Sequence, residues 1–439
     1  MGLSGPQITE NATQRIIVRP PVEEDDSLSV VSQVPRQKNL SRMFIAFEVA
    51  QFRWFWLSIL FSSMSMGTRM LAQGWLVLEI TDSPFWVGIV AGLQGLGLVG
   101  FGAMGGTIVD RFDKRKVLAV VQLGSGVAAI LLGLLAVTGH IELWHMMILA
   151  GIQGLFMAIQ MPASNSLAYN LVGPTRLLNA MAARLVAMNI SRVVGSLIAG
   201  VLISSLGTWS CFIFAGSSSL VGMGFLWFIS GSFKTTNTLE PFWQATSKGL
   251  KYIWMANDIR RLLLLSLVME TFGFSHLVMM PVMARDVLQV GATGLGLLSA
   301  ASGIGSTLST LIVASLGDFR RKGFLVTVTA LGAGAFLGAF AFSPWFWASI
   351  VTVALAGGCL MAYDVTMGTM LQLLSKDDMR GRVLGVYGLT FGFTPIGGFL
   401  AGAIATFMSA PIAVGAGGVL IFAYVASIAR PTLGISSRT

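Results

Sequence analysis

The sequence predicts an all-α integral membrane protein whose twelve transmembrane helices form two pseudo-symmetric bundles of six. Three observations lead to this prediction. The chain is 54% hydrophobic and only 11% charged. Its apolar residues form blocks of the ~20 residues that a helix needs to cross a bilayer. The second half of the chain also repeats features of the first half, as described below.

The composition excludes several other classes of protein. Soluble domains carry about a quarter of their residues as charges, far more than this chain of 439 residues with a mean hydropathy of +0.78. The net charge of +9 does not indicate nucleic-acid binding, because the basic residues cluster between apolar blocks. Two cysteines and three scattered histidines are too few for a disulfide scaffold or a zinc site, so we expect no metal and no cofactor.

The order of apolar blocks and polar segments predicts the domain organisation. Residues 1–45 form a polar tail with an acidic run and without the apolar core of a signal peptide, so a disordered cytoplasmic tail is expected. Residues 46–230 and 259–430 hold six spans each, and 431–439 form a second cytoplasmic tail. The twelve spans lie near 54–80, 84–108, 117–138, 144–168, 181–204, 208–230, 260–283, 291–316, 323–342, 345–371, 383–407 and 409–429.

The positions of Lys and Arg predict the orientation in the membrane. Loops after the even-numbered spans carry basic residues, whereas the loops after spans 1, 3, 5, 9 and 11 carry none and the loop after span 7 carries only Arg285. Basic loops stay in the cytoplasm, so both termini are expected there, in a multi-pass protein of the plasma membrane. The linker 231–258 interleaves Lys248 and Lys251 with Tyr252 and Trp254, which is typical of an amphipathic helix at the membrane surface.

The two halves of the chain resemble each other at fixed offsets. A shift of 202 residues places Gly195 and Gly200 of span 5 on Gly397 and Gly402 of span 11. A shift of 208 residues places Asp110, at the end of span 2, on Asp318 at the end of span 8, and a basic cluster follows each. A repeat of six plus six spans is typical of secondary transporters, whose halves rock about a site near the middle of the membrane.

Several motifs resemble the major facilitator superfamily. The segment 106–116 has the superfamily's pattern between spans 2 and 3, a Gly, three residues, Asp-Arg and a basic cluster, and 317–322 echoes it in the second half. The segments 74–84, Pro162-Ala163 and 380–383 are similar to the branch that contains enterobactin-type siderophore exporters and macrolide efflux proteins. The resemblance covers residues 50–430 and implies secondary transport, with spans 3, 6, 9 and 12 as outer supports.

The motif between spans 2 and 3 predicts a cytoplasmic gate. Its acid is favourable near the positive N-terminus of a helix and its cations near carbonyl ends, so the motif can hold the halves together on that side. For the cations, the alternative is that they only set the topology. The gate residues expected are Gly106, Asp110, Arg111, Arg115, Asp318, Arg320 and Arg321.

The sequence departs from the superfamily's antiporter motifs at two places, and both departures argue against proton antiport. Ala150 stands where many antiporters carry an Arg three residues before Gln153-Gly154. Span 5 has Gly195-Ser196 where Gly-Pro is expected, while Thr394–Gly398 in span 11 supplies the fuller version of that motif.

Ionisable residues inside spans are costly unless they face a wet or paired interior. They are absent from spans 3, 6, 9 and 12 apart from end residues, which agrees with the outer position of those spans. Arg69 can line a pocket or pair with a neighbouring helix, Arg192 can replace the missing span-4 Arg, and His276 is expected to be a packing residue. The residues expected on the substrate and proton pathway are Arg69, Gln73, Gln153, Gln160, Arg192, Glu270 and Asp364.

These features together predict a proton-coupled exporter of small amphipathic molecules of the drug, macrolide or siderophore class, with Glu270 or Asp364 as the proton carrier. The partners expected are a small-molecule substrate, protons and the lipid bilayer, with no nucleic acid, and the protein is expected to be a monomer. A facilitator or importer of a small solute is the alternative on the same fold. An enzyme or a non-transporting receptor is disfavoured because no clustered catalytic set is found, and no ATP-binding Gly-Lys-Ser/Thr loop is present.

Overall fold

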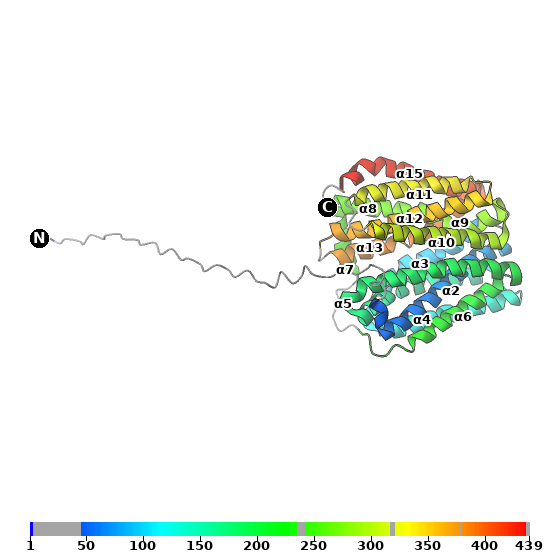
Figure 1. The fold of residues 1–439 in the computed structure, drawn as a ribbon, viewed down its shortest axis with the longest axis horizontal. Helices are drawn as coiled ribbons and strands as arrows, with labels where there is room; N and C mark the ends of the chain where they lie inside the picture. Colours follow the sequence, from blue (N-terminus) through cyan, green and yellow to red (C-terminus); the bar gives the residue numbers. More distant parts are fainter. Residues whose placement is uncertain (3–44, 235–241, 317–320, 377–378, 436–439) are drawn as a thin grey trace. The chain divides into compact units, whose positions relative to one another are not determined.

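The computed structural model describes residues 1–2, 45–234, 242–316, 321–376 and 379–435, except for the side chains of 103–104, 107, 110, 178, 242–246 and 429–435. The chain divides into two units, Met1–Arg42 and Met43–Thr439. Nearly all of the predicted tail 1–45 lies outside the described residues. In the second unit, treated by itself below, every regular element that the structure describes is a helix (Figure 1).

The elements follow the predicted spans in order. The first half consists of a 3-10 turn and five helices: η2 (Ile45–Glu48), α2 (Ala50–Thr81), α3 (Pro84–Arg111), α4 (Lys114–Val137), α5 (Leu143–Leu206) and α6 (Thr208–Leu226). The linker forms α7 (Phe242–Met255). The second half contains α8 (Asn257–Val268), η3 (Met269–Gly273), α9 (His276–Val282), η4 (Met283–Val287), α10 (Gly291–Ser315), α11 (Lys322–Ala341), α12 (Phe346–Leu374), α13 (Arg380–Thr390), α14 (Phe393–Phe407) and α15 (Ala410–Ile435).

Eleven helical segments of the described chain are long and apolar enough to cross a membrane, so this is a multi-pass membrane protein. The first predicted span is α2, which is 32 residues long but not among the eleven. Its polar stripe of Ser62, Ser65, Arg69 and Gln73 lowers its mean hydropathy. All four side chains are buried, because α2 packs against α5 and α6.

Two of the helical runs are irregular. Helix α5 contains spans 4 and 5, which are joined at Gly173, whose φ of 71° is left-handed and open to glycine without strain. Span 7 runs from α8 to η4 and contains two π-helical turns, η3 and η4. Turns of this kind are often found at functional sites, and η3 carries Glu270.

The internal repeat is visible where the halves meet. The first-half helices α3 and α5 pack against the second-half helices α14 and α10, respectively. A Cβ on Gly88 would lie 3.1 Å from the Cα of Gly402, and a Cβ on Gly200 would lie 3.0 Å from the Cα of Gly296. Under the 202- and 208-residue shifts these two contacts are equivalent. In Figure 1 the blue-to-green helices up to α6 lie together and the yellow-to-red helices from α10 to α15 lie together.

The apolar core distinguishes the two ends of the helices. We call the end with the turns at 82–83, 207 and 288–290 the Asp82 end, and the end with the turns at 112–113 and 375–379 the basic end. At the Asp82 end a single buried cluster unites the halves and includes Trp75, Val87, Met279 and Leu295. Toward the basic end each half has a cluster of its own, with Phe55 and Leu118 in one and Met269 and Tyr387 in the other. The described halves therefore share their core at the Asp82 end only.

Candidate functional site

Two carboxylates lie inside the second half, each with a hydroxyl donor from span 11. Glu270 on η3 is 3% exposed, and its Oε2 accepts a hydrogen bond from Thr394 Oγ1 on α14. Asp364 on α12 is half-buried, and its Oδ1 accepts a hydrogen bond from Tyr387 Oη on α13. Both hydroxyl donors therefore belong to span 11. Tyr387 lies on its first helical piece, α13, and Thr394 lies on its second, α14.

A cation from the first half interacts electrostatically with one member of this pair. Arg192 on α5 interacts electrostatically with Asp364, and Asp364 interacts with Glu270. Gly303 on α10 leaves room for Arg192, because a Cβ there would lie 3.7 Å from Arg192 Cδ and 2.9 Å from a methyl group of Val193. The arrangement places opposite charges on the two sides of the interface between the halves.

The close approach of α14 to η3 holds Glu270 beside Thr394. A Cβ on Gly397 would lie 1.7 Å from the carbonyl oxygen of Thr271, which no side chain can accept. On the neighbouring position, a Cβ on Gly398 would lie 2.6 Å from a methyl group of Val278. The glycines of the Thr394–Gly398 motif therefore let the helix carrying Thr394 lie directly against the π turn.

The other sequence-predicted pathway residues form no hydrogen bond or ion pair with these two carboxylates in the part of the chain that the structure describes. Arg69 on α2 is 7% exposed, and it forms no hydrogen bond or ion pair with any residue that the structure describes. Gln73 lines a cavity of about 60 Å³ between the halves, together with Gln94, Pro281 and Thr394. The structure thus places Gln73 near Thr394 at the interface, while Arg69 does not pair with either carboxylate.

Gln153 and Gln160 lie on α5 within the first half. Gln153 Oε1 accepts a hydrogen bond of 3.3 Å from Ser125 Oγ on α4, and its buried Nε2 has no partner in the described part of the chain. Gln160 is half-buried. His276 is 2% exposed, and its Nδ1 lies 2.6 Å from the carbonyl oxygen of Gly273.

Sequence reasoning missed the tyrosines of the site. The chain has only five tyrosines. Tyr387 donates a hydrogen bond to Asp364, and Tyr363 interacts electrostatically with Glu270 and Asp364. Two signals in the sequence could have identified these tyrosines. Tyrosine is rare inside apolar spans, and Tyr363 directly precedes Asp364. Thr394 was noticed as part of a motif but not as the partner of Glu270.

The predicted gate is described only in part. The Asp110 side chain and residues Asp318 and Arg320 lie outside the described residues. Gly106 lies within α3, while Arg111 and Arg321 are exposed. Arg115 donates a hydrogen bond to the carbonyl oxygen of Ile229 at the end of the first half.

Asp113, which the motif did not single out, organises the turn before α4. Its carboxylate caps α4 by accepting hydrogen bonds from the backbone N–H groups of Arg115 at 2.9 Å and Lys116 at 3.4 Å, and it accepts one of 3.1 Å from Phe233. Burial acts to raise the pKa of Asp113, but the three N–H donors and the charge of Arg115 outweigh it, so the pKa lies below its usual value. This carboxylate joins the start of span 3 to the segment that leaves span 6.

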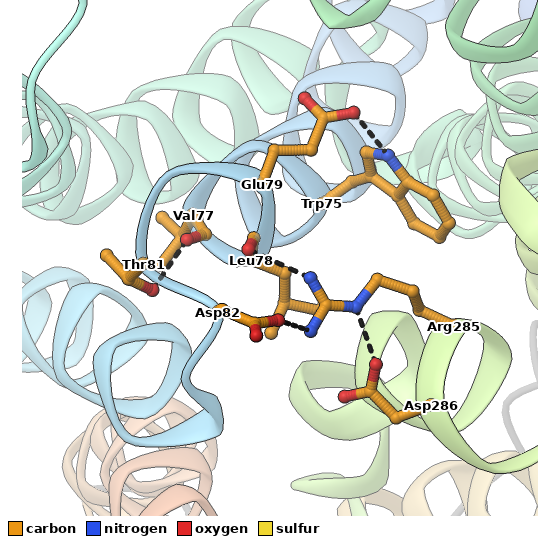
Figure 2. Close-up of polar contacts among 8 residues, drawn as sticks. All are labelled: Trp75, Val77, Leu78, Glu79, Thr81, Asp82, Arg285 and Asp286. Atoms are coloured by element: carbon orange, nitrogen blue, oxygen red, sulfur yellow. Dashed lines mark hydrogen bonds and ion pairs between the residues drawn. The ribbon is translucent and has the colours of Figure 1, made fainter.

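At the Asp82 end an arginine connects the halves (Figure 2). Arg285 on η4 donates hydrogen bonds to the carbonyl oxygen of Leu78 at 2.9 Å and to Asp82 Oδ1 at 2.5 Å, and its Nε bonds to Asp286 at 2.6 Å. Nearby, Glu79 accepts hydrogen bonds from Trp75 and Thr208. We call the contact of Arg285 with Leu78 and Asp82 the Arg285 clamp.

Comparisons with known proteins agree with this architecture. A family model described as transmembrane secretion effector matches residues 42–435. The chain is 25% identical over 337 residues to the enterobactin exporter EntS of Shigella flexneri, covering 76% of this chain and 80% of that protein. The EntS protein of Escherichia coli O6:K15:H31 matches to the same extent.

Solved structures share the fold at low identity. A nucleoside transporter, NupG, superposes with a TM-score of 0.70 at 11% identity, covering 88% of this chain and 99% of that chain. A POT family transporter in complex with 5-aminolevulinic acid superposes with a TM-score of 0.73 at 10% identity, covering 88% of this chain and 96% of that chain. At these identities the likeness concerns the fold alone.

Proposed function

The chain belongs to the transmembrane secretion effector family of the major facilitator superfamily of transporters, and on this basis we propose that it is a proton-coupled exporter that works by alternating access. Its substrate is a small amphipathic molecule of the drug, macrolide or siderophore class. The basic end and both termini face the cytoplasm, and a monomer in the plasma membrane is the transporting unit. Two relatives described as enterobactin exporters support the direction of transport.

The observation that carries the proposal is the electrostatic interaction of Arg192 with Asp364 across the interface, together with the hydrogen bond between Thr394 and Glu270. A carboxylate that gains a proton loses its charge and with it the attraction to a guanidinium. Coupling free energies between linked sites are about 1–3 kcal/mol, enough to shift the balance between two arrangements of the halves. Proton occupancy of Asp364 and Glu270 is thereby linked to which end of the protein is open.

The shared core at the Asp82 end supports an arrangement that opens toward the basic end. Substrate enters from the cytoplasm between the separate cores of the two halves. Opening toward the other side requires the Arg285 clamp to break and the halves to meet at the basic end. In this cycle no residue acts as a catalyst, because no covalent bond of the substrate changes.

The test uses proteoliposomes with an imposed pH gradient and a substrate identified by an accumulation screen in an efflux-deficient host, with and without a protonophore. Glu270→Gln and Asp364→Asn are each expected to lower gradient-driven export by about tenfold or more, in line with a coupling above ~1.4 kcal/mol. The matched control is Glu48→Gln, because Glu48 is 61% exposed and forms a surface ion pair with Arg176, which contributes little.

Full pH-dependent export by both variants would show that these carboxylates do not carry the proton. A second outcome concerns the wild-type protein. If it equilibrates substrate across the membrane and responds neither to the pH gradient nor to the protonophore, it is a facilitator, which is the alternative on this fold.

A further inference from the structure

We propose that the corner between α7 and α8 is a binding surface for the headgroups of anionic phospholipids in the adjoining leaflet. The proposal is independent of the transported substrate. It starts from the two faces of α7, which the structure describes with side chains from Ser247 onward.

One face of α7 packs against the protein. Ile253 is 4% exposed and belongs to the core of the second half. A Cβ on Gly249 would lie 3.1 Å from Arg382 Cβ, so α7 rests closely on α13. The hydroxyl of Tyr252 accepts a hydrogen bond of 3.4 Å from the backbone N–H of Lys376. These contacts fix which way the helix is turned.

The opposite face is exposed and mixes apolar with cationic residues. Leu250, Trp254 and Met255 are 55%, 69% and 76% exposed, and Lys248 and Lys251 are exposed among them. A helix lying in hydrocarbon would not hold two lysines on its outer face, and a helix in water would not present a Trp and a Met there. The combination is typical of a helix lying in the headgroup region.

The corner itself fixes Trp254 at the start of a membrane-spanning run. Ala256 leaves the helical conformation between α7 and α8, with φ −90° and ψ 93°. Arg260 then folds back, with its guanidinium 5.4 Å from the centroid of the Trp254 ring and a hydrogen bond of 3.1 Å to the Trp254 carbonyl oxygen. Because α8 begins span 7, this contact sets the Trp254 ring at the level where tryptophans favour the membrane–water interface.

The charges of the corner select the lipid. Between residues 242 and 261 the chain has four cations, Lys248, Lys251, Arg260 and Arg261, and the single carboxylate of Asp258. That carboxylate lies 3.8 Å from Arg261. A basic segment beside a membrane-spanning helix attracts anionic lipids, so the excess of cations here favours phosphatidylglycerol-type headgroups over zwitterionic ones.

The experiment measures quenching of tryptophan fluorescence by brominated lipids in vesicles of phosphatidylcholine containing a fixed fraction of either brominated phosphatidylglycerol or brominated phosphatidylcholine. The Trp254 signal is the difference between the full-length protein and Trp254→Phe. Brominated phosphatidylglycerol is expected to quench it more strongly, and Lys251→Gln is expected to reduce the lipid preference about fivefold. High salt is expected to weaken the preference as well.

Trp347 provides the matched control, since it is 75% exposed at the Asp82 end of α12. Its signal, taken from Trp347→Phe, is expected to be quenched equally by the two brominated lipids. Equal quenching of the Trp254 signal by both lipids, or a preference unchanged by Lys251→Gln, would overturn the proposal, as would a Trp254 signal that neither lipid quenches. Arg321→Gln, at the exposed start of α11, tests whether any cation of the basic end has the same effect, and no change in the Trp254 preference is expected for it.

Discussion

The contact between α2 and α5 and the contact between η3 and α14 are equivalent under the 202-residue repeat, yet they differ in structure. In the first half, Thr68 Oγ1 donates a hydrogen bond of 3.1 Å to the carbonyl oxygen of Gly195, and a Cβ on Gly195 would lie 3.1 Å from the nearest backbone oxygen. In the second half, a Cβ on Gly397 would lie only 1.7 Å from such an oxygen. The π turn of η3 brings the backbone of span 7 closer.

The two contacts also differ in charge. Among the described residues the two buried arginines, Arg69 and Arg184, lie in the first half, as does the half-buried Arg192, whereas the carboxylates Glu270 and Asp364 lie in the second. The repeat therefore preserves the approach of the helices but not their chemistry. Since opposite charges attract across a medium of low dielectric constant, this asymmetry makes the interface between the halves sensitive to the charge of the second half.

Alanine at the two equivalent glycines tests the structural difference most strongly. Gly397→Ala is expected to lower the free energy of unfolding by about 3 kcal/mol, because a methyl group overlaps the Thr271 carbonyl oxygen and the backbone must move. Gly195→Ala is expected to change it by less than about 1 kcal/mol, since the lost space is offset by the gain in helix propensity. Thermal unfolding in detergent measures both.

Equal destabilisation by the two substitutions would contradict the inference that the π turn tightens the second contact. A Gly397→Ser variant, with an equally large Cβ, should behave like Gly397→Ala and serves as a control.

The threonine hydroxyl found at each of the two contacts tests the difference in chemistry. Thr394→Val removes a hydrogen bond to a carboxyl group, and a hydrogen bond to a charged group contributes about 1.5–3 kcal/mol, so export is expected to fall by about tenfold or more. Thr68→Val removes a bond to a backbone oxygen that contributes about 1 kcal/mol, and export is expected to stay within about threefold of wild type. Transport rates in proteoliposomes at equal protein density provide the comparison.

Thr394→Ser keeps the hydroxyl and should retain export. A Thr394→Val variant with wild-type export would mean that Glu270 does not depend on its hydroxyl partner.

The starts of span 3 and span 9 extend the comparison to the basic end, because the 208-residue shift places Asp113 on Arg321. Asp113 caps α4, whereas Arg321 makes no side-chain cap on α11. Asp113→Ala is expected to cost about 1 kcal/mol of stability, and Arg321→Ala less than about 0.5 kcal/mol. Chemical denaturation at several pH values separates the two effects.

The pH dependence of the Asp113 effect has a definite sign. Its folded pKa lies below the usual value, so the stabilisation is complete above the unfolded pKa of about 3.9 and is lost as the pH falls through the folded pKa. The difference between wild type and Asp113→Ala should therefore be constant above about pH 5 and shrink in acid. A difference that grows in acid would assign the effect to another group.

The fold was predictable because its signals extend along the whole chain. Every predicted span overlaps a helical element, and the offsets of 202 and 208 residues point to the glycine contacts at which the halves meet. Even the amphipathic linker helix was expected from lysines interleaved with aromatic residues. Span length, loop charge and repeat register depend on tens of residues, so no single position decides them.

The site was less predictable because it depends on side-chain directions. Glu270 and Asp364 were chosen for the cost of burying them, but a period of 3.6 residues does not foresee a π turn, which changes the direction in which Glu270 points. Arg69 follows from the same rule, but it forms no ion pair with either carboxylate in the described structure. Tyr387 lies near the end of α13 and Asp113 lies at the start of α4, where an offset of one residue changes the hydrogen-bond partner.

The polar stripe of α2 has a consequence for biosynthesis. This helix leaves the ribosome before the other membrane-spanning helices that the structure describes, and an arginine at the centre of a lone span costs about 2.5–3.5 kcal/mol on insertion. Its resting place is formed by α5 and α6, which are made more than fifty residues later. We therefore expect the nascent first span to remain beside the insertion machinery, neither released into lipid nor committed to the bilayer, until the later spans of its own half emerge to receive it.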